Sequence, residues 1–183
     1  AKGATPYGYL MGLALPRPIN ETWISAFAAG LAEDNRLFNT VLLGGDTTTH
    51  PGGVILSVTA LGTVPEGQIC LRSGAKPGDI VYVSGTLGDS ALALGILQGT
   101  IAAGDAVRNA LTARYHLPLP RVGLGIALRG IASACLDISD GLVQDAGHIA
   151  SNSAVGIALH IPALPLSPEA RILLSGNPAY IET

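Results

Sequence analysis

Few residues of this sequence are charged or aromatic, and it contains no long apolar run. Of its 183 residues, 13% are charged and 4% are aromatic, whereas 48% are hydrophobic. No uninterrupted apolar stretch reaches the roughly 18 residues needed to span a bilayer, so a membrane is not an expected partner. The apolar residues are mostly small or aliphatic and alternate with short polar breaks, which suits a buried α/β core or an oligomer interface.

Basic residues and cysteines are also scarce. Ten Lys and Arg against thirteen Asp and Glu give a formal net charge of −3. Without a basic stripe the chain has no general attraction for polynucleotides, so nucleic acid is not an expected partner. Cys70 and Cys135 stand far apart in the sequence, and two such thiols imply neither a zinc site nor a disulfide framework. The first residues do not resemble a signal peptide, and a cytoplasmic location is expected.

Patterns typical of strands and helices alternate along the chain. Strands are predicted over 9–15, 40–43, 54–64, 80–84, 135–138 and 155–161. Helices are predicted from an N-cap at Thr22 to about residue 36, over 90–98, in a stretch ending at 111, and over 121–129 and 140–150. This alternation predicts an α/β, or α+β, layered fold. The polar link 47–53 favours a hairpin, and turn residues near 71 favour a boundary between domains 1–70 and 71–183.

The most informative segment is Asp137-Ile-Ser-Asp-Gly141, which places two carboxylates and a hydroxyl where a strand is predicted to meet a helix. Extended geometry would put Asp137 and Ser139 on one face of the strand end. An Asp at position 140 is more often a helix cap than a ligand, so capping competes with metal binding there. The carboxylate of Asp137 follows an apolar run and needs a cation or hydrogen-bond donors.

The segment Gly44-Gly-Asp46 likewise places a carboxylate at the end of a predicted strand. Two residues without side chains let a large ligand approach the backbone, and a carboxylate follows at once. Such a site favours Mg²⁺, which takes one or two carboxylates while phosphate oxygens and waters complete its shell. The competing interpretation, favoured for the tripeptide in isolation, is a plain hairpin turn.

Other polar groups have structural interpretations of equal or greater weight. Gly85-Thr-Leu-Gly-Asp89 lacks the ending of a P-loop, so Asp89 is interpreted as a helix N-cap. Arg72 could bind a phosphate with two hydrogen bonds or could simply be exposed. Asp145 and His148, three residues apart, are interpreted as an exposed helical pair.

The chain carries five motifs in a fixed order: Leu43-Gly-Gly-Asp-Thr-Thr48, Leu71-Arg-Ser-Gly-Ala-Lys-Pro-Gly-Asp79, Val83-Ser-Gly-Thr-Leu-Gly-Asp89, Pro120-Arg-Val122 and Leu136-Asp-Ile-Ser-Asp-Gly-Leu142. Each motif is weak by itself. Together, at about the family's spacing and over nearly the whole chain, they resemble the thiamine-monophosphate kinase family. The resemblance implies part of an N-terminal barrel-forming domain, followed by most of a C-terminal α/β domain.

The same resemblance implies transfer of the γ-phosphoryl group of ATP onto thiamine monophosphate by a homodimer that uses Mg²⁺. The residues that match metal ligands of the family are Asp46, Asp137 and Asp140. Those that match its ATP contacts are Gly45, Arg72 and Ser139. No covalent catalytic residue is expected, because a phosphate acceptor needs positioning and charge neutralisation more than it needs a base.

The chain also departs from the family's pattern. Family members carry an acidic segment and an Asn-Leu-Ser-Asp strand ahead of the matching region, and an Asp-Tyr-Glu-Leu motif after it, and neither motif occurs in these 183 residues. We therefore expect little or no kinase activity from the 183-residue chain. The alternatives are a related ATP-dependent synthetase, a non-catalytic nucleotide-binding or dimerisation module and, least favoured, a purely structural α/β protein.

Overall fold

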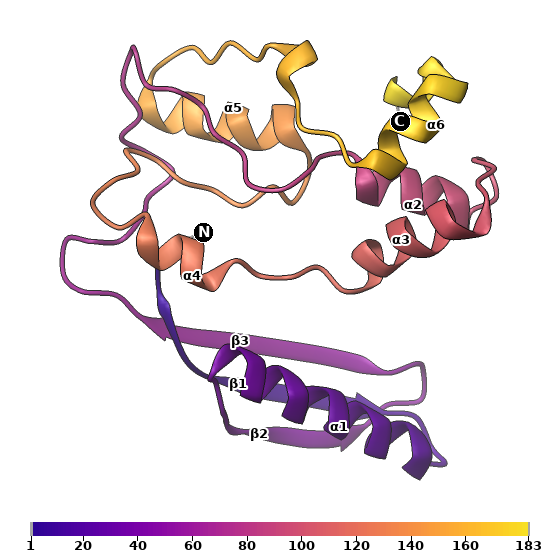
Figure 1. The fold of residues 1–183 in the computed structure, drawn as a ribbon. Helices are drawn as coiled ribbons and strands as arrows, with labels where there is room; N and C mark the ends of the chain where they lie inside the picture. The colour runs from indigo at the N-terminus through magenta and orange to yellow at the C-terminus, as the bar shows by residue number, and fades with distance from the viewer. Residues whose placement is uncertain (1, 183) are drawn as a thin grey trace. The chain divides into compact units, whose positions relative to one another are not determined.

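A computed structural model describes residues 2–182 and shows a small sheet and a set of helices (Figure 1). The elements are β1 (Thr5–Leu15), α1 (Glu21–Phe38), β2 (Leu42–Thr49), β3 (Ile55–Thr63), α2 (Asp89–Leu97), α3 (Asp105–His116), α4 (Val122–Ala127), α5 (Leu142–Ser153), η1 (Ile161–Ala163), α6 (Pro168–Gly176) and η2 (Pro178–Glu182). This mixture of strands and helices confirms the predicted fold class. Within the described part, no helix has the length and apolar character needed to cross a bilayer.

The chain divides into two compact units, each built from two separate stretches of sequence. The first unit runs to Leu71 and also includes Arg121–Leu136, and the second comprises Arg72–Pro120 together with the chain from Asp137 onward. The assignment of 1–70 to an ATP-binding and dimerisation domain, and of 71–183 to a partial C-terminal domain, stays a prediction.

The sheet of the first unit has β1 at its centre. The strand order is β2-β1-β3, with β2 parallel and β3 antiparallel to β1. The hairpin predicted over 47–53 is therefore wrong, because β2 and β3 lie on opposite sides of β1 and do not pair. A parallel neighbour requires a crossover, and α1 supplies it between β1 and β2.

The N-cap of the crossover helix α1 lies two residues earlier than predicted. Asn20, rather than Thr22, is the N-cap, and its side-chain oxygen accepts a hydrogen bond of 3.0 Å from the backbone N–H of Trp23. Ile24, Phe27 and Leu31 are half-buried at helical spacing, whereas the rest of the first three turns is exposed. The helix thus turns one apolar stripe inward.

The parallel pair β1–β2 depends on a glycine. β2 runs through Gly44, Gly45 and Asp46, so the interpretation of these residues as a hairpin turn is wrong. Gly45 has a φ of +153°, and a Cβ atom there would lie 1.9 Å from the carbonyl oxygen of Met11, its partner on β1. No other residue type fits this position without displacing the strand.

The second unit has its core among α2, α3 and α6. The buried apolar side chains of this core are Leu92, Ala93, Ile96, Ile101, Leu111, Ala170 and Leu173. The three helices also meet at one buried carboxylate, that of Asp89, which is 3% exposed. Asp89 was predicted to be an N-cap, but Gly88 holds that position and Asp89 begins α2 itself.

The carboxylate of Asp89 connects the three helices through polar contacts. Its oxygens accept hydrogen bonds from Ser167 (2.5 Å), the N-cap of α6, and from Thr86 (2.6 Å), and it forms an ion pair with Arg114 of α3. A buried charge is stable only when its hydrogen-bonding capacity is satisfied in this way.

Three predicted strands are not formed. The segments 80–84, 135–138 and 155–161 have no strand pairing within residues 2–182. Ile80 and Tyr82 are 74% and 85% exposed. A β-branched and aromatic segment has the propensity for a strand, but it becomes one only when a neighbour completes its hydrogen-bond ladder.

The two glycines at the start of β2 give a matched pair of variants. We expect Gly45→Ala to lower the free energy of unfolding by about 1–3 kcal/mol through backbone strain, with the steric clash adding to this loss. Gly44→Ala should change it by about 1 kcal/mol or less, because its Cβ would meet only Leu10 at 3.8 Å. Urea unfolding followed by circular dichroism measures both, and equal losses would contradict this account of the β1–β2 pair.

The buried carboxylate of the second unit gives another test. Asp89→Ala leaves Thr86, Ser167 and Arg114 without their shared acceptor, and we expect a loss of about 2 kcal/mol or more. Asp105→Ala removes an exposed acidic residue from the first turn of α3 and should be nearly neutral. Thermal unfolding of the two variants compares them, and similar melting temperatures would refute the role given to Asp89.

Candidate functional site

Three of the six predicted site residues lie together in the loop before α5. Asp137, Ser139 and Asp140 are exposed there, and the hydroxyl of Ser139 donates a hydrogen bond of 2.7 Å to the carboxylate of Asp137. Asp140 accepts a hydrogen bond of 3.1 Å from the side-chain amide of Gln144. The loop therefore presents two carboxylates and a hydroxyl to solvent.

The capping role considered for Asp140 is wrong. Gly141 occupies the N-cap position of α5 and has no side chain to contribute. The backbone N–H groups of Ser139, Asp140 and Gly141 instead donate to one oxygen of Asp145, at 2.8, 3.1 and 3.1 Å. The carboxylate of Asp140 therefore does not cap α5.

Asp145 is the residue that the sequence interpretation missed. It is only 6% exposed, so its assignment to an exposed helical pair with His148 is wrong for Asp145, although His148 itself is exposed. The available signal was its helical position, one turn from Leu142 and Ile149, because these residues place an acidic side chain on the apolar stripe of the helix. A carboxylate on such a stripe needs buried donors.

The electrostatics of Asp145 follow from these contacts. Burial by itself raises the pKa of the carboxyl, but the N–H groups of Ser139, Asp140 and Gly141 and the charge of His148 outweigh it. The net result is a pKa below the usual range. The ionised carboxylate of Asp145, in α5, therefore accepts the hydrogen bonds of the loop backbone.

Arg72 lies in a second loop held by the same helix. The hydroxyl oxygen of Ser153, the last residue of α5, accepts hydrogen bonds of 3.1 Å each from the N–H groups of Gly74 and Ala75. Arg72 is exposed, and its guanidinium forms no ion pair within the described part of the chain. Helix α5 thus fixes the 139–141 loop at its N-terminal end and the loop that follows Arg72 at its C-terminal end.

A backbone hydrogen bond fixes where both loops begin. The N–H of Cys135 donates to the carbonyl of Leu71 at 2.8 Å, within the first unit. Arg72 follows the acceptor by one residue and Asp137 follows the donor by two. The segments carrying Arg72 and Asp137 therefore enter the second unit from adjacent backbone positions.

The remaining predicted residues, Gly45 and Asp46, lie on β2 of the first unit. Asp46 is exposed, and within residues 2–182 its carboxylate has no hydrogen-bond or ion-pair partner. Gly45 is required by the sheet itself, which gives it a structural role independent of any ligand. The structure therefore groups Asp137, Ser139 and Asp140 in one loop of the second unit, and it describes Gly45 and Asp46 as part of the first.

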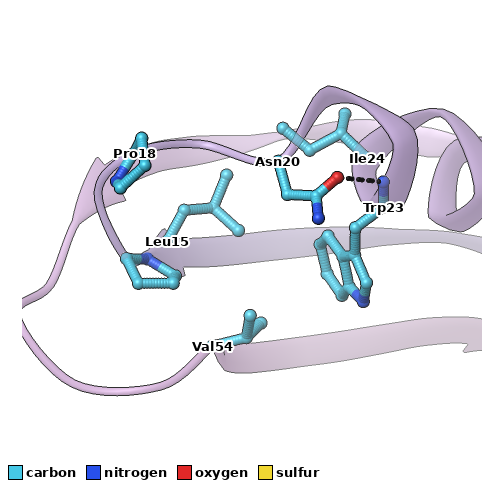
Figure 2. Close-up of a pocket in the computed structure, with 7 residues that line it drawn as sticks. Leu15, Pro18, Asn20, Trp23, Ile24 and Val54 are labelled. Atoms are coloured by element: carbon cyan, nitrogen blue, oxygen red, sulfur yellow. Dashed lines mark hydrogen bonds between the residues drawn. The ribbon is translucent and has the colours of Figure 1, made fainter.

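A small cavity lies elsewhere in the first unit, between the start of α1 and the ends of two strands (Figure 2). Its volume is about 200 Å³ and its lining residues are Leu15, Pro16, Pro18, Asn20, Trp23, Ile24 and Val54. No charged side chain lines it, and the one polar side chain, Asn20, is engaged as the cap of α1. It is smaller than typical ligand sites of roughly 300–1,000 Å³ and offers nothing to hold an anion.

Comparisons with known proteins agree with the five motifs. Residues 1–64 match the family model for the N-terminal domain of AIR synthase related proteins. A thiamine-monophosphate kinase from Caulobacter vibrioides is 44% identical over 182 residues, which are 100% of this chain and 51% of that protein. The predicted resemblance is confirmed.

Solved structures give the same relationship. A crystal structure of thiamine-monophosphate kinase from Stenotrophomonas maltophilia is 42% identical with a TM-score of 0.89, and the match covers 98% of this chain and 58% of that one. A structure of AaThiL complexed with AMPPCP and TMP is 32% identical with a TM-score of 0.88, over 97% of this chain and 56% of that one. By sequence and by fold, this chain is similar to thiamine-monophosphate kinases, and it spans about half the length of the relatives that it matches.

Proposed function

We propose that this chain contributes to transfer of the γ-phosphoryl group of ATP onto the phosphate of thiamine monophosphate. The observation that carries the proposal is the loop before α5, where Asp137 and Asp140 present two exposed carboxylates and Ser139 lies between them. A relative of similar fold was solved with AMPPCP and TMP, which supports this ligand class. A kinase of this kind draws on cytoplasmic ATP, and the cytoplasm is the location we propose.

The residues present fit Mg²⁺ bound together with a nucleotide. Within residues 2–182 no cluster of three or more His, Cys, Asp or Glu forms, so the described chain builds no closed metal cage. Mg²⁺ does not need one, because it typically binds one or two carboxylates and keeps waters and substrate phosphates as its other ligands. Asp137 and Asp140 would hold it in the second unit, and Asp46 on β2 is a separate candidate ligand in the first unit. When bound, it neutralises charge on the phosphates.

The other proposed contacts position the nucleotide. Arg72 has an exposed guanidinium with no ion-pair partner within the described residues, and its fork of donors fits phosphate oxygens. Ser139 would offer its hydroxyl in the second unit, and Gly45 is a separate candidate contact in the first unit, where it would allow close approach to the backbone of β2. None of these groups is a nucleophile here, and direct transfer between two phosphates requires none. That the 183-residue chain has little or no turnover stays a prediction.

Nucleotide binding tests this function. We expect the chain to bind AMPPCP more tightly with Mg²⁺ than without it in a calorimetric titration. Asp137→Asn should weaken the Mg²⁺-dependent binding by about tenfold or more, the equivalent of roughly 1.4 kcal/mol for one lost charged contact. Asp105→Asn, which alters an exposed acidic residue in the first turn of α3, serves as the matched control. AMPPCP binding that does not depend on Mg²⁺ and is unchanged by Asp137→Asn would contradict the proposal.

We also propose a homodimer formed through the open face of the sheet. Leu10, on the central strand β1, is 46% exposed, whereas Tyr9 and Leu13 on the opposite face are 8% exposed. Ile55 of β3 pairs with Ala14 of β1 on the same face as Leu10 and is 50% exposed. An exposed apolar face of this kind supports association with another copy. The same feature favours the dimerisation-module alternative.

The oligomeric state tests the dimer. Sedimentation velocity should find a dimer for the unmodified chain, and Leu10→Glu should raise its dissociation constant about tenfold or more by burying an unpaired charge. Leu37→Glu alters an equally large and exposed residue on α1 and should leave the dimer intact. A monomeric parent chain, or equal effects of the two variants, would contradict association through the sheet.

A further inference from the structure

The loop before α5 has the backbone arrangement of an anion site. Three successive N–H groups, those of Ser139, Asp140 and Gly141, converge on a single point at the N-terminal end of a twelve-residue helix. Convergent N–H groups and a positive helix end attract phosphate or carboxylate. The expected occupant of such a loop would therefore be a phosphate group of the nucleotide.

That point is already occupied by the protein's own anion. A single oxygen of Asp145 accepts all three hydrogen bonds, and the side chain is 6% exposed. A phosphate cannot use the same N–H groups while Asp145 holds them. The exposed side of the loop is left with Asp137 and Asp140, which are acceptors, so its outer surface is suited to a cation.

We propose that Asp145 is a positioning residue that keeps this loop in a cation-binding state and closes it to anions. The inference rests on the proposed function, because the cation concerned is the metal that would bind Asp137 and Asp140. Asp145 does not touch the metal or the nucleotide. It acts through the backbone of residues 139–141, a segment that contains both Asp140 and Ser139, the hydrogen-bond partner of Asp137.

Asp145→Ala distinguishes positioning from a merely structural role, because it predicts opposite changes for two ions. Loss of a partner that orients metal ligands typically costs 10–100-fold in metal affinity, and we expect a loss in this range for Mn²⁺, measured by electron paramagnetic resonance. Affinity for inorganic phosphate should rise, since the three N–H groups become available. Phosphate binding is followed by the ¹H–¹⁵N NMR shifts of residues 139–141. A merely destabilised loop would lose affinity for Mn²⁺ without gaining affinity for phosphate.

Two further variants control the experiment. Asp145→Asn retains one oxygen that can accept the hydrogen bonds, so it should restore part of the Mn²⁺ affinity and gain less phosphate binding than Asp145→Ala. It also keeps the test decisive if the alanine variant fails to fold. Asp105→Ala removes an exposed acidic residue from the first turn of α3 and should change neither ion's affinity.

The outcomes separate this inference from the proposed function. If the parent chain binds Mn²⁺ and Asp145→Ala binds it equally well without gaining phosphate, the positioning role is overturned and the proposed metal site survives. If the parent chain binds no Mn²⁺, the proposed metal site fails. In that case a gain of phosphate binding in Asp145→Ala would still support the exclusion of anions by Asp145, and no gain would overturn it.

Discussion

The acceptance of three backbone hydrogen bonds by one buried carboxylate, that of Asp145, determines what the second unit can do. Loops at helix N-termini usually attract anions. In this loop the carboxylate of Asp145 already accepts the backbone N–H groups, and the exposed side chains are acidic. The opposite end of α5 uses the hydroxyl of Ser153 to hold the loop that follows Arg72. One helix therefore fixes both loops that carry proposed ligands, with the carboxylates on one and the guanidinium on the other.

The first unit relies on close approach of backbones rather than on buried charge. β2 can lie parallel to β1 at this register because Gly45 leaves room for the carbonyl of Met11. The same pairing places Asp46 opposite Gly12, on an exposed part of the strand. The geometry of the sheet thus explains by itself why residue 45 is a glycine. The proposed contact with ATP would be an additional role for the same residue.

Sequence reasoning predicted the elements better than their partners. The helix over 90–98 matches α2 closely, because its apolar run and turn signals are local. The segment 80–84 has strand propensity but no ladder in residues 2–182, and β2 pairs with β1 rather than β3. Such pairings are set by distant residues that no local pattern contains. The motif at 137–141 indicated the proposed site, which stays a prediction, whereas Asp145 was missed because a charge pair at helical spacing resembles an exposed face.

The most direct test of this account is to locate the bound cation. Substoichiometric Mn²⁺ added to the ¹⁵N-labelled chain broadens the NMR signals of nearby amides. The account predicts selective broadening at residues 137–141, with a weaker effect near Arg72 and none in the core of α2 and α3. Broadening confined to other segments, or no selective broadening at all, would contradict a cation-binding loop ahead of α5.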